Sequence, residues 1–374
     1  MWHNGDYYYY TAILLLLSTV APLFAASSMR SARAGLSCSK PFTTCVKIVQ
    51  VDVPSPKSGQ ALIKLSSSSI NPSDVDEVEM DGCLFGCGND MAGTVVSCNG
   101  CSRLKKGDHV WGFANPSFAD FVTAPEDDVA LRPSNVPKEQ AGTIPEVGLT
   151  SLFSLKRTNA LPGTPMPAGS PWANRTNVTV VITAGSGGTG FIGIEIAKAY
   201  GATNIITSTT GEASIAFVKS LGATRVIDYK VEDIFAALPD DSVDFVYDNY
   251  GADNTADKAM RTLRKGGTYL MMPHGECYAS KKQAPPCISA HPKPGVRQVN
   301  YITSVDFQAH ALDGLKELTS LFEENKLTAH VAISYELNDI ALALNYSAGG
   351  GEGGVNNNHF GKIAVVMRDN STVL

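Results

Sequence analysis

The sequence predicts an α/β protein that combines a small, mostly β domain with a doubly wound parallel sheet. In residues 45–123, short apolar or alternating segments lie between Gly and Pro residues, which is typical of strands. From Val178 onward, apolar strands alternate with helical segments, as in a parallel sheet covered by helices on both faces. With 374 residues, 44% of them hydrophobic, the chain can bury a core in each of two domains.

The first domain is predicted from short strands that end at Gly or Pro residues. Between residues 138 and 155 the apolar spacing becomes helical. Residues 161–173 are rich in Pro and Gly, so we expect a surface loop or linker there. We assign residues 36–160 to this domain and 161–176 to a linker. The expected strands are residues 46–51, 61–65, 91–97 and 109–113.

A second domain is predicted at residues 177–326, where strands and helices alternate. Residues 327–374 are expected to return to the first domain and to end in a strand at residues 362–367. Within the second domain, the expected strands are residues 178–183, 204–207, 225–228, 245–248 and 268–272, and the expected helices are residues 189–200, 213–221, 253–264 and 306–325.

Residues 1–34 are expected to be a targeting segment. Ile13–Leu17 and Val20–Ala26 are apolar and end in small residues, which is typical of a secretory signal and too short for a membrane helix of ~20 apolar residues. Met1–Tyr10 lacks Lys and Arg, so an uncleaved anchor or a wrongly assigned start codon stays open. Ser27–Ser39 is rich in Ser, Ala and Arg without acids, as in a transit peptide. We expect entry to the secretory pathway (ER lumen or secretion), with a plastid reached by signal plus transit peptide as the alternative.

Sequons and cysteines fit a secretory route. Four Asn-x-Ser/Thr sequons begin at Asn174, Asn177, Asn345 and Asn370 and predict a glycoprotein. The eight cysteines form close pairs that predict local disulfides, with free thiols as the alternative. These pairs are Cys38 with Cys45, Cys83 with Cys87, Cys98 with Cys101, and Cys277 with Cys287.

Charge argues against nucleic acid as a partner. The net charge is −6 at pH 7 and there is no long run of Lys or Arg, so nothing would neutralise a phosphate backbone. We therefore expect no nucleic-acid partner. Because the N-terminal apolar segment is too short, we also expect no stable membrane span in the mature chain.

A glycine-rich segment predicts a dinucleotide-binding loop. The strand ending at Thr183 runs into residues 184–193, which contain G-x-G-x-x-G at Gly188, Gly190 and Gly193. These glycines allow a tight turn and a close approach to a pyrophosphate, which binds at the positive end of the next helix. Because the motif lies between a predicted strand and a predicted helix, it is specific. Gly187 and Thr189 belong to the same expected site.

The end of the second strand favours NADPH over NADH. An NAD site has an acidic residue about 20 residues after the motif, to hold the ribose 2′-hydroxyl. This chain has Ser208, Thr209 and Thr210 there, whose hydroxyls can bind a 2′-phosphate, while Glu212 nearby opposes it. Tyr229 could pack on the same phosphate or simply cover the sheet edge. The candidate cations are Lys219, Arg225 and Lys230.

By its motifs the chain resembles the quinone oxidoreductase branch of the medium-chain dehydrogenase/reductase superfamily. Besides the glycine loop, the order and spacing of eight segments carry the resemblance over residues 42–367. These segments are Ile70–Asp74, Gly88–Gly93, Lys106–Val110, Pro145–Thr150, Leu221–Ala223, Val226–Tyr229, Asp248–Gly251 and Gly361–Lys362.

The resemblance implies a GroES-like catalytic domain split by an inserted Rossmann domain, with the nicotinamide in between. It also implies hydride transfer from NADPH to a quinone or an α,β-unsaturated carbonyl, and a homodimer. Asn71 and Asp74 would lie at the nicotinamide end and are the candidate catalytic residues. A tyrosine of some relatives is missing there, which leaves the proton donor open. The residues expected to line the cofactor are Thr150, Asn249, Met272 and Gly361.

No metal is expected. Where zinc-dependent relatives would have a cysteine and a histidine, this chain has Ser73-Asp74 and Gly88-Asn89-Asp90. A rival Cys₄ site from Cys83, Cys87, Cys98 and Cys101 stays open. By residue type His109, His274 and His359 are possible acids. The alternative functions are a zinc-independent alcohol or carbonyl dehydrogenase and a nucleotide-binding relative without turnover.

Overall fold

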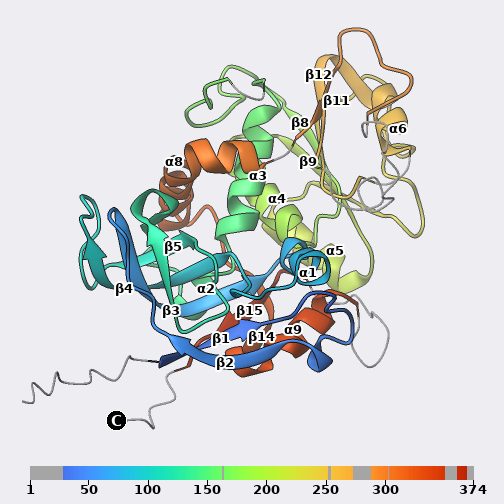
Figure 1. The fold of residues 1–374 in the computed structure, drawn as a ribbon. Helices are drawn as coiled ribbons and strands as arrows, with labels where there is room; N and C mark the ends of the chain where they lie inside the picture. Colours follow the sequence, from blue (N-terminus) through green and yellow to red (C-terminus); the bar gives the residue numbers. More distant parts are fainter. Residues whose placement is uncertain are drawn as a thin grey trace, which may run out of the picture.

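The computed structural model describes residues 28–161, 164–251, 254–272, 288–301, 303–349 and 360–368. It confirms the α/β class: a mostly β domain and a parallel sheet with helices lie side by side, with α3 (Pro145–Arg157) and α8 (Ser304–Glu323) between them (Figure 1). None of the helices in the described ranges is long and apolar enough to cross a bilayer.

The β domain is built around one sheet of strands from both ends of the chain. The strand order is β14-β15-β3-β4-β5-β7, and β6 also pairs with β3. C-terminal strand β15 is antiparallel to β3, so the last described segment completes the sheet. The strands are β3 (Gln60–Ile70), β4 (Asp90–Asn99), β5 (His109–Phe113), β6 (Phe121–Pro125), β7 (Val129–Leu131), β14 (Val331–Glu336) and β15 (Lys362–Val366).

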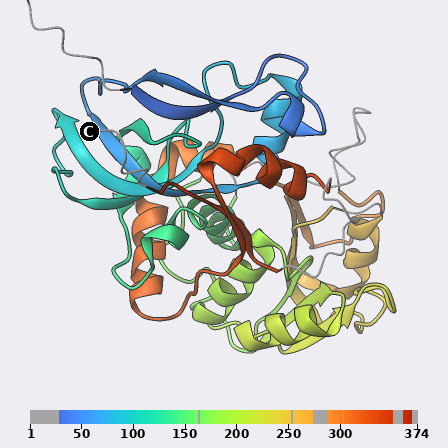
Figure 2. The ribbon, with the colours of Figure 1, turned by 90° about the horizontal axis from the view of Figure 1, so that it is seen from below.

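The structure differs from the expected targeting segment at its end. Residues 28–33 form strand β1 (Ser28–Arg33), which pairs along its length with β2 (Lys47–Asp52) on the outer face of the β domain, near α9 (Ile340–Ser347) (Figure 2). Ala32 is buried and its amide donates to Phe118 O at 2.8 Å. Arg30 forms an ion pair with Asp120 at 2.7 Å. The folded domain therefore includes residues that the composition suggested were a leader.

The second domain has a six-stranded sheet in the order β10-β9-β8-β11-β12-β13, parallel throughout. The order reverses between β8 and β11, which is where ligands bind in such sheets. The strands are β8 (Thr179–Ile182), β9 (Asn204–Thr209), β10 (Arg225–Asp228), β11 (Val243–Asp248), β12 (Leu263–Met271) and β13 (Arg297–Asn300), and the helices are α4 (Gly188–Ala199), α5 (Glu212–Leu221) and α6 (Thr255–Thr262).

One predicted helix is two helices. Residues 138–155 divide into α2 (Lys138–Ala141) and α3, with a break at Gly142. A Cβ atom at Gly142 would lie 2.3 Å from Ser67 O, so only glycine allows the chain to turn this close to β3. The break gives α3 its own N-terminus, which lies beside Asp90 at the start of β4, where the site lies.

The two domains share one of the three apolar clusters of the described residues. Trp111 of β5 packs edge-on against Phe322 of α8, at 5.6 Å between ring centroids. The same cluster continues through α3 to Val180 of the parallel sheet. The expected linker is also anchored, because Trp172 is buried and stacks on Phe245. The domains are therefore held together by packing.

Two of the predicted disulfides are present, Cys38–Cys45 and Cys83–Cys87. Cys98 and Cys101 are free thiols, contrary to expectation, and Cys277 and Cys287 lie outside the described residues.

The sequon at Asn345 cannot carry a glycan in this fold. Its side chain is buried and accepts a hydrogen bond from Phe42 N at 2.8 Å. Asn174 and Asn177 are exposed, whereas Asn370 lies outside the described residues.

Candidate active site

The glycine loop connects β8 to α4 and is closed on itself. Cβ atoms at Gly185 and Gly190 would lie 2.0 Å from Thr207 Oγ1 and 2.1 Å from Ala184 O. A Cβ at Gly193 would lie 3.4 Å from Tyr247 Cε1, which is an ordinary contact, so this position does not require glycine for space. The loop thus presents backbone amides at the N-terminus of α4, which begins after Gly187, and this geometry fits a pyrophosphate.

The hydroxyls at the end of β9 hold this loop. Ser208 accepts from Gly185 N through its carbonyl (2.9 Å) and from Ala184 N through Oγ (3.3 Å). Thr209 Oγ1 donates to Ser186 Oγ at 2.8 Å. Ser208 and Thr209 are buried. Their contribution to the cofactor site is therefore to shape the loop, which the sequence pattern did not reveal.

Thr210 lies at the edge of the site and is bonded to Asp228 at the end of β10. Backbone amide groups at Lys230 and the Thr210 side chain lower the pKa of this exposed carboxyl. Tyr229, next to it, is 54% exposed. Arg225 is bonded to Ala237 O, so it does not point to this edge. Lys219 is in the last turn of α5, away from the end of β9, which leaves Lys230 as the nearest predicted cation.

On the nicotinamide side, Asn249 offers a free acceptor. Its backbone N and Nδ2 donate to Thr183, at 2.9 and 3.1 Å, but its buried Oδ1 has no hydrogen-bond partner among the residues that the structure describes. Buried polar atoms are normally paired, so this oxygen fits a ligand donor such as a carboxamide. Two other residues of the expected cofactor lining, Thr150 on α3 and Met272 just after β12, are also buried.

Gly361 joins the returning chain to the cofactor loop. Its amide donates to Ser186 O at 3.1 Å. Its φ is +97°, and a Cβ would lie 2.5 Å from His330 O, so the position requires glycine. A Cβ at Gly188 would lie 3.1 Å from Lys362 Cδ and 3.0 Å from Val147 Cγ1. The loop is therefore in contact with both β15 and α3.

A buried polar cluster lies beside the loop where α1 (Pro72–Met80), β4, α3 and β15 meet. Lys362 Nζ donates to Ile70 O at 2.9 Å and to Asn71 Oδ1. Asn71 Nδ2 donates to Asp90 Oδ2 at 2.9 Å, and Asn71 N donates to Asp74 Oδ2 at 2.7 Å. The structure thus brings the two candidate catalytic residues together and adds Lys362 and Asp90.

Asp90 also organises the start of α3. Its Oδ1 accepts from Glu146 N at 2.7 Å, and its Oδ2 accepts from Ser69 Oγ at 2.7 Å. Glu146 Oε1 in turn accepts from Ser73 Oγ at 2.9 Å. In the sequence, Glu146 stands out only as part of the segment Pro145–Thr150, as an acidic residue that follows the helix-starting Pro145.

Burial makes the ionisation of this cluster costly. It raises the pKa of Asp74 well above its ordinary value, with the neighbouring Glu146 adding to the effect, and it also raises the pKa of Asp90. Burial and the charge of Asp90 raise the pKa of Glu146 to about 7. Burial lowers the pKa of Lys362 although three carboxyls oppose this. The cluster is therefore able to hold protons near neutral pH.

The rival Cys₄ site does not form. Cys83 and Cys87 are bonded to each other, and Cys98 and Cys101 lie at the end of β4 and just beyond it. Within the described part of the chain, no group of three or more His, Cys, Asp or Glu side chains is arranged to hold a metal ion.

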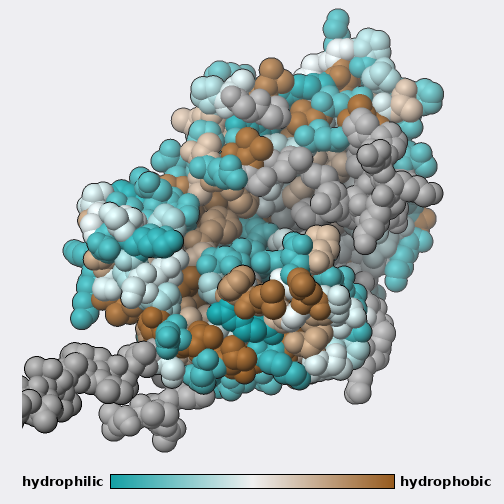
Figure 3. All heavy atoms as spheres, viewed as in Figure 1, coloured by the Kyte–Doolittle hydropathy of each residue, from teal (hydrophilic) through white to brown (hydrophobic). Residues whose placement is uncertain are grey.

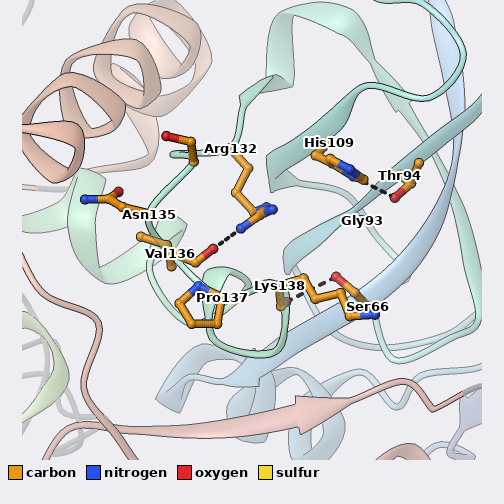
Figure 4. A pocket seen from close by; sticks show the side chains of 10 residues that line it. Ser66, Gly93, Thr94, His109, Arg132, Asn135, Val136, Pro137 and Lys138 are labelled. Carbon is orange, nitrogen blue, oxygen red and sulfur yellow. Dashed lines mark hydrogen bonds between the residues drawn. The ribbon is translucent and has the colours of Figure 1, made fainter.

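A cavity of about 350 Å³ lies on another face, between β4, β5 and the segment before α2 (Figure 4). Three basic residues, His109, Arg132 and Lys138, line it, and Thr94 Oγ1 is 3.0 Å from His109 Nδ1. None of its lining residues belongs to the glycine loop or the polar cluster. His109 is thus not placed to act at the site. The surface between the domains, beside α1, is itself hollowed (Figure 3).

Comparisons with known proteins agree with this architecture. Residues 57–138 match the family model described as alcohol dehydrogenase GroES-like domain, and residues 221–365 match the one described as zinc-binding dehydrogenase. The chain is 36% identical over 197 residues to the chloroplast envelope quinone oxidoreductase homolog of Arabidopsis thaliana, covering 49% of this chain and 56% of that one.

A second Arabidopsis relative, the chloroplastic NADPH-dependent alkenal/one oxidoreductase, is 30% identical over 59% of this chain and 56% of its own length. The chain therefore spans little more than half of the length of these relatives. The quinone oxidoreductase structure from Coxiella burnetii superposes with a TM-score of 0.71 at 23% identity, over 91% of this chain and 100% of that one, which supports the fold. In its two family-model matches, its relatives and its fold, the chain is similar to the quinone oxidoreductase branch of the medium-chain dehydrogenase/reductase superfamily.

Proposed function

We propose that the protein is an NADPH-dependent oxidoreductase that transfers a hydride to a quinone or an α,β-unsaturated carbonyl without zinc. The observation that carries this proposal is the position of the polar cluster, which touches the dinucleotide loop through Lys362 and Gly188. When bound, the reduced nicotinamide would supply the hydride. The chain would orient it through Asn249, Thr150 and Met272 and would face it with Asn71.

NADPH is favoured because the end of β9 lacks an acidic residue and the edge beyond it offers an exposed tyrosine and lysine. Tyr229 and Lys230 would contact the 2′-phosphate. The Asp228 carboxylate accepts hydrogen bonds from the Thr210 side chain and from backbone amides, which partly compensate its negative charge within the turn. The alkenal/one oxidoreductase relative from Arabidopsis thaliana is named as NADPH-dependent, which supports the same cofactor here.

Zinc-free chemistry follows from the types of residue that form the site. Asn71, Ser73 and Asp74 supply amide, hydroxyl and carboxyl groups, whereas a catalytic zinc site in this fold needs thiolate and imidazole ligands. The amide and hydroxyl groups would polarise the acceptor carbonyl by hydrogen bonding as negative charge develops. The protein would act mainly by positioning two reactants.

For the compartment we propose a plastid, not secretion. The printed names of the two Arabidopsis relatives place those proteins in the chloroplast, which supports the transit-peptide alternative and gives no support to export. A fusion of residues 1–40 to a fluorescent protein tests this proposal. Fluorescence in the ER or the medium would contradict it. A homodimer is proposed on the family resemblance alone.

The test of function is cofactor oxidation by residues 28–374 with a small quinone and with an alkenal. We expect turnover with NADPH that exceeds turnover with NADH and survives strong chelation. NADPH binding without turnover of either acceptor would instead favour a non-catalytic nucleotide-binding relative. Oxidation of alcohols would favour the alcohol dehydrogenase alternative, and chelator-sensitive turnover would overturn the zinc-free mechanism.

A further inference from the structure

Reduction of an enone needs a proton as well as a hydride. Hydride addition at the β-carbon leaves an enolate, and its α-carbon must be protonated to complete the reaction. The tyrosine found in some relatives is absent here, and the Asn71 side-chain amide is not a general acid and already donates to Asp90. A proton donor must therefore come from another group near the loop.

Glu146 and Ser73 have the geometry for this role. Ser73 is in the first turn of α1, two residues after Asn71, and its Oγ is 2.9 Å from Glu146 Oε1. Both residues are partly exposed, whereas Asn71, Asp74, Asp90 and Lys362 are buried. Val147, the next residue after Glu146, packs against the cofactor loop at Gly188. The Ser73–Glu146 pair is thus the accessible edge of the cluster.

The surroundings of Glu146 keep a proton on it near neutral pH. The groups that face it are Asp74 and Glu77 from α1, Asp90 from β4 and Lys362 from β15. Burial raises the pKa of Glu146 to about 7, and the charges of Asp90 and Glu77 add to this effect, whereas Lys362 opposes it. A pKa near the working pH is the property that general acid catalysis requires.

We propose that Glu146 and Ser73 form a proton relay to the enolate, an inference that rests on the proposed enone reductase function. When bound, the reduced nicotinamide would supply the hydride to the β-carbon and would be the group that is oxidised. The Ser73 hydroxyl gives its proton to the α-carbon and takes one from the Glu146 carboxyl. Glu146 is left as a carboxylate and recovers a proton from water at the exposed edge. The C=C bond gains one hydride and one proton.

The first test is the pH profile of enone reduction at saturating NADPH. In the wild type, kcat falls as the pH rises through about 7, because the relay needs protonated Glu146. Glu146→Gln keeps an acceptor for Ser73 but carries no transferable proton, so kcat at pH 6 falls about 100-fold and this limb disappears. Ser73→Ala has a similar effect, and the double variant is no worse than either single one, because the two residues act as a unit.

A second test reads the product. With an α-substituted enone in D₂O, the wild type places deuterium on one face of the α-carbon, whereas Glu146→Gln gives both faces because bulk water then protonates a released enolate. Quinone reduction is less affected by Glu146→Gln, since a hydroquinone anion is far less basic than an enolate. Glu139→Gln, an exposed acid on α2, is the matched control and leaves all readouts unchanged.

The failure of the relay and the failure of the proposed function give different results. The relay alone would be overturned if the wild type reduces the enone and Glu146→Gln retains the same rate, the same pH limb and the same face selectivity. Absence of enone turnover in the wild type, with NADPH binding intact by fluorescence titration, would overturn both. Equal losses for enone and quinone with weaker NADPH binding would show that Glu146 is structural, which also overturns the relay.

Discussion

At the scale of single residues, Lys362 is the one cation in a cluster of three carboxyls. It is 4% exposed, and its Nζ donates to Asn71 Oδ1 and to the carbonyl oxygen of Ile70, which together fix the position of Asn71. A buried cation of this kind stabilises its partners mainly because its removal would leave unpaired charges in a poorly solvated place. The stem of the same side chain lies against the cofactor loop.

We expect Lys362→Met to lower the free energy of unfolding by about 3–5 kcal/mol at pH 8 and by less at pH 5. The folded-state pKa values of Asp74 and Asp90 are already raised by burial, so the folded protein holds more protons than the unfolded one above pH ~4. Stability therefore falls as the pH rises, and loss of the cation makes this fall steeper. Urea unfolding at both pH values measures it.

The control for Lys362→Met is Lys326→Met, which removes a lysine from an exposed ion pair with Glu324. This change should alter stability by less than about 0.5 kcal/mol. Equal losses at pH 5 and pH 8 for Lys362→Met would contradict the charge argument and point to packing of the side-chain stem.

At the scale of elements, a buried ion pair joins the end of α3 to the start of α8. Arg157 Nε and Nη2 donate to Asp306 at 2.8 and 2.5 Å, and the Tyr301 hydroxyl donates to the same carboxylate. Although burial opposes ionisation, the hydrogen bonds from Arg157 and Tyr301 lower the pKa of Asp306. Arg157 also holds the following loop through Leu161 O at 2.6 Å.

Asp306→Asn should lower the free energy of unfolding by about 3–5 kcal/mol at pH 7, because it leaves a buried guanidinium without a counter-charge. Since the folded-state pKa of Asp306 lies below its ordinary value, the pair's contribution is complete at neutral pH and is lost on acidification through that lower pKa. Thermal unfolding against pH measures both effects. Asp313→Asn, exposed on the same helix, is the matched control and should cost under about 0.5 kcal/mol.

Strand β1 gives a second prediction at this scale. Compared with removal of residues 1–27, removal of residues 1–34 should lower Tm by about 5–10 °C, because it also deletes buried Met29 and Ala32 and the Arg30–Asp120 pair. Differential scanning fluorimetry of the two truncated proteins decides it. Equal Tm values would mean that β1 is dispensable and that the expected leader could extend through it.

At the scale of the whole molecule, the shared core couples the two domains. Trp111, α3, α8 and the parallel sheet belong to one apolar cluster, so neither domain can lose its structure without exposing part of the other. The cofactor loop also contacts both, through Ser186 with Gly361 and through Gly188 with Val147. A bound dinucleotide would therefore stabilise both domains together.

We expect one unfolding transition. At a concentration 100 times its Kd, NADPH should raise the free energy of unfolding by about 2.7 kcal/mol and thereby shift the transition to a higher temperature. Gly190→Ala should abolish this shift, because the added Cβ would lie 2.1 Å from Ala184 O and force the loop open. Calorimetry with and without NADPH measures it. Gly35→Ala is the matched control, because no atom lies within 4 Å of the added Cβ and the φ of Gly35 is not positive, so it should keep the NADPH shift. Two separate transitions would contradict the shared core.

The sequence by itself determined the fold class and the dinucleotide loop. Both depend on local patterns: the alternation of strands and helices from Val178 onward, and a glycine motif between a strand and a helix. The ordered motifs also indicated Asn71, Asp74 and Asn249. These features are encoded by neighbouring residues, so one sequence was enough to recognise them.

Only the tertiary structure decided which distant groups meet. Lys362, Asp90 and Glu146 come from three elements far apart in the chain, and their shifted pKa values arise from mutual burial, which no local pattern records. Long-range contacts also decided three local outcomes. Ser208 and Thr209 support the glycine loop. Asn345 is buried against Phe42, and residues 28–33 pair with β2 in a two-stranded sheet. The composition of residues 28–33 is that of a leader segment. Their role as a strand depends on pairing with β2, and local composition does not record such a contact.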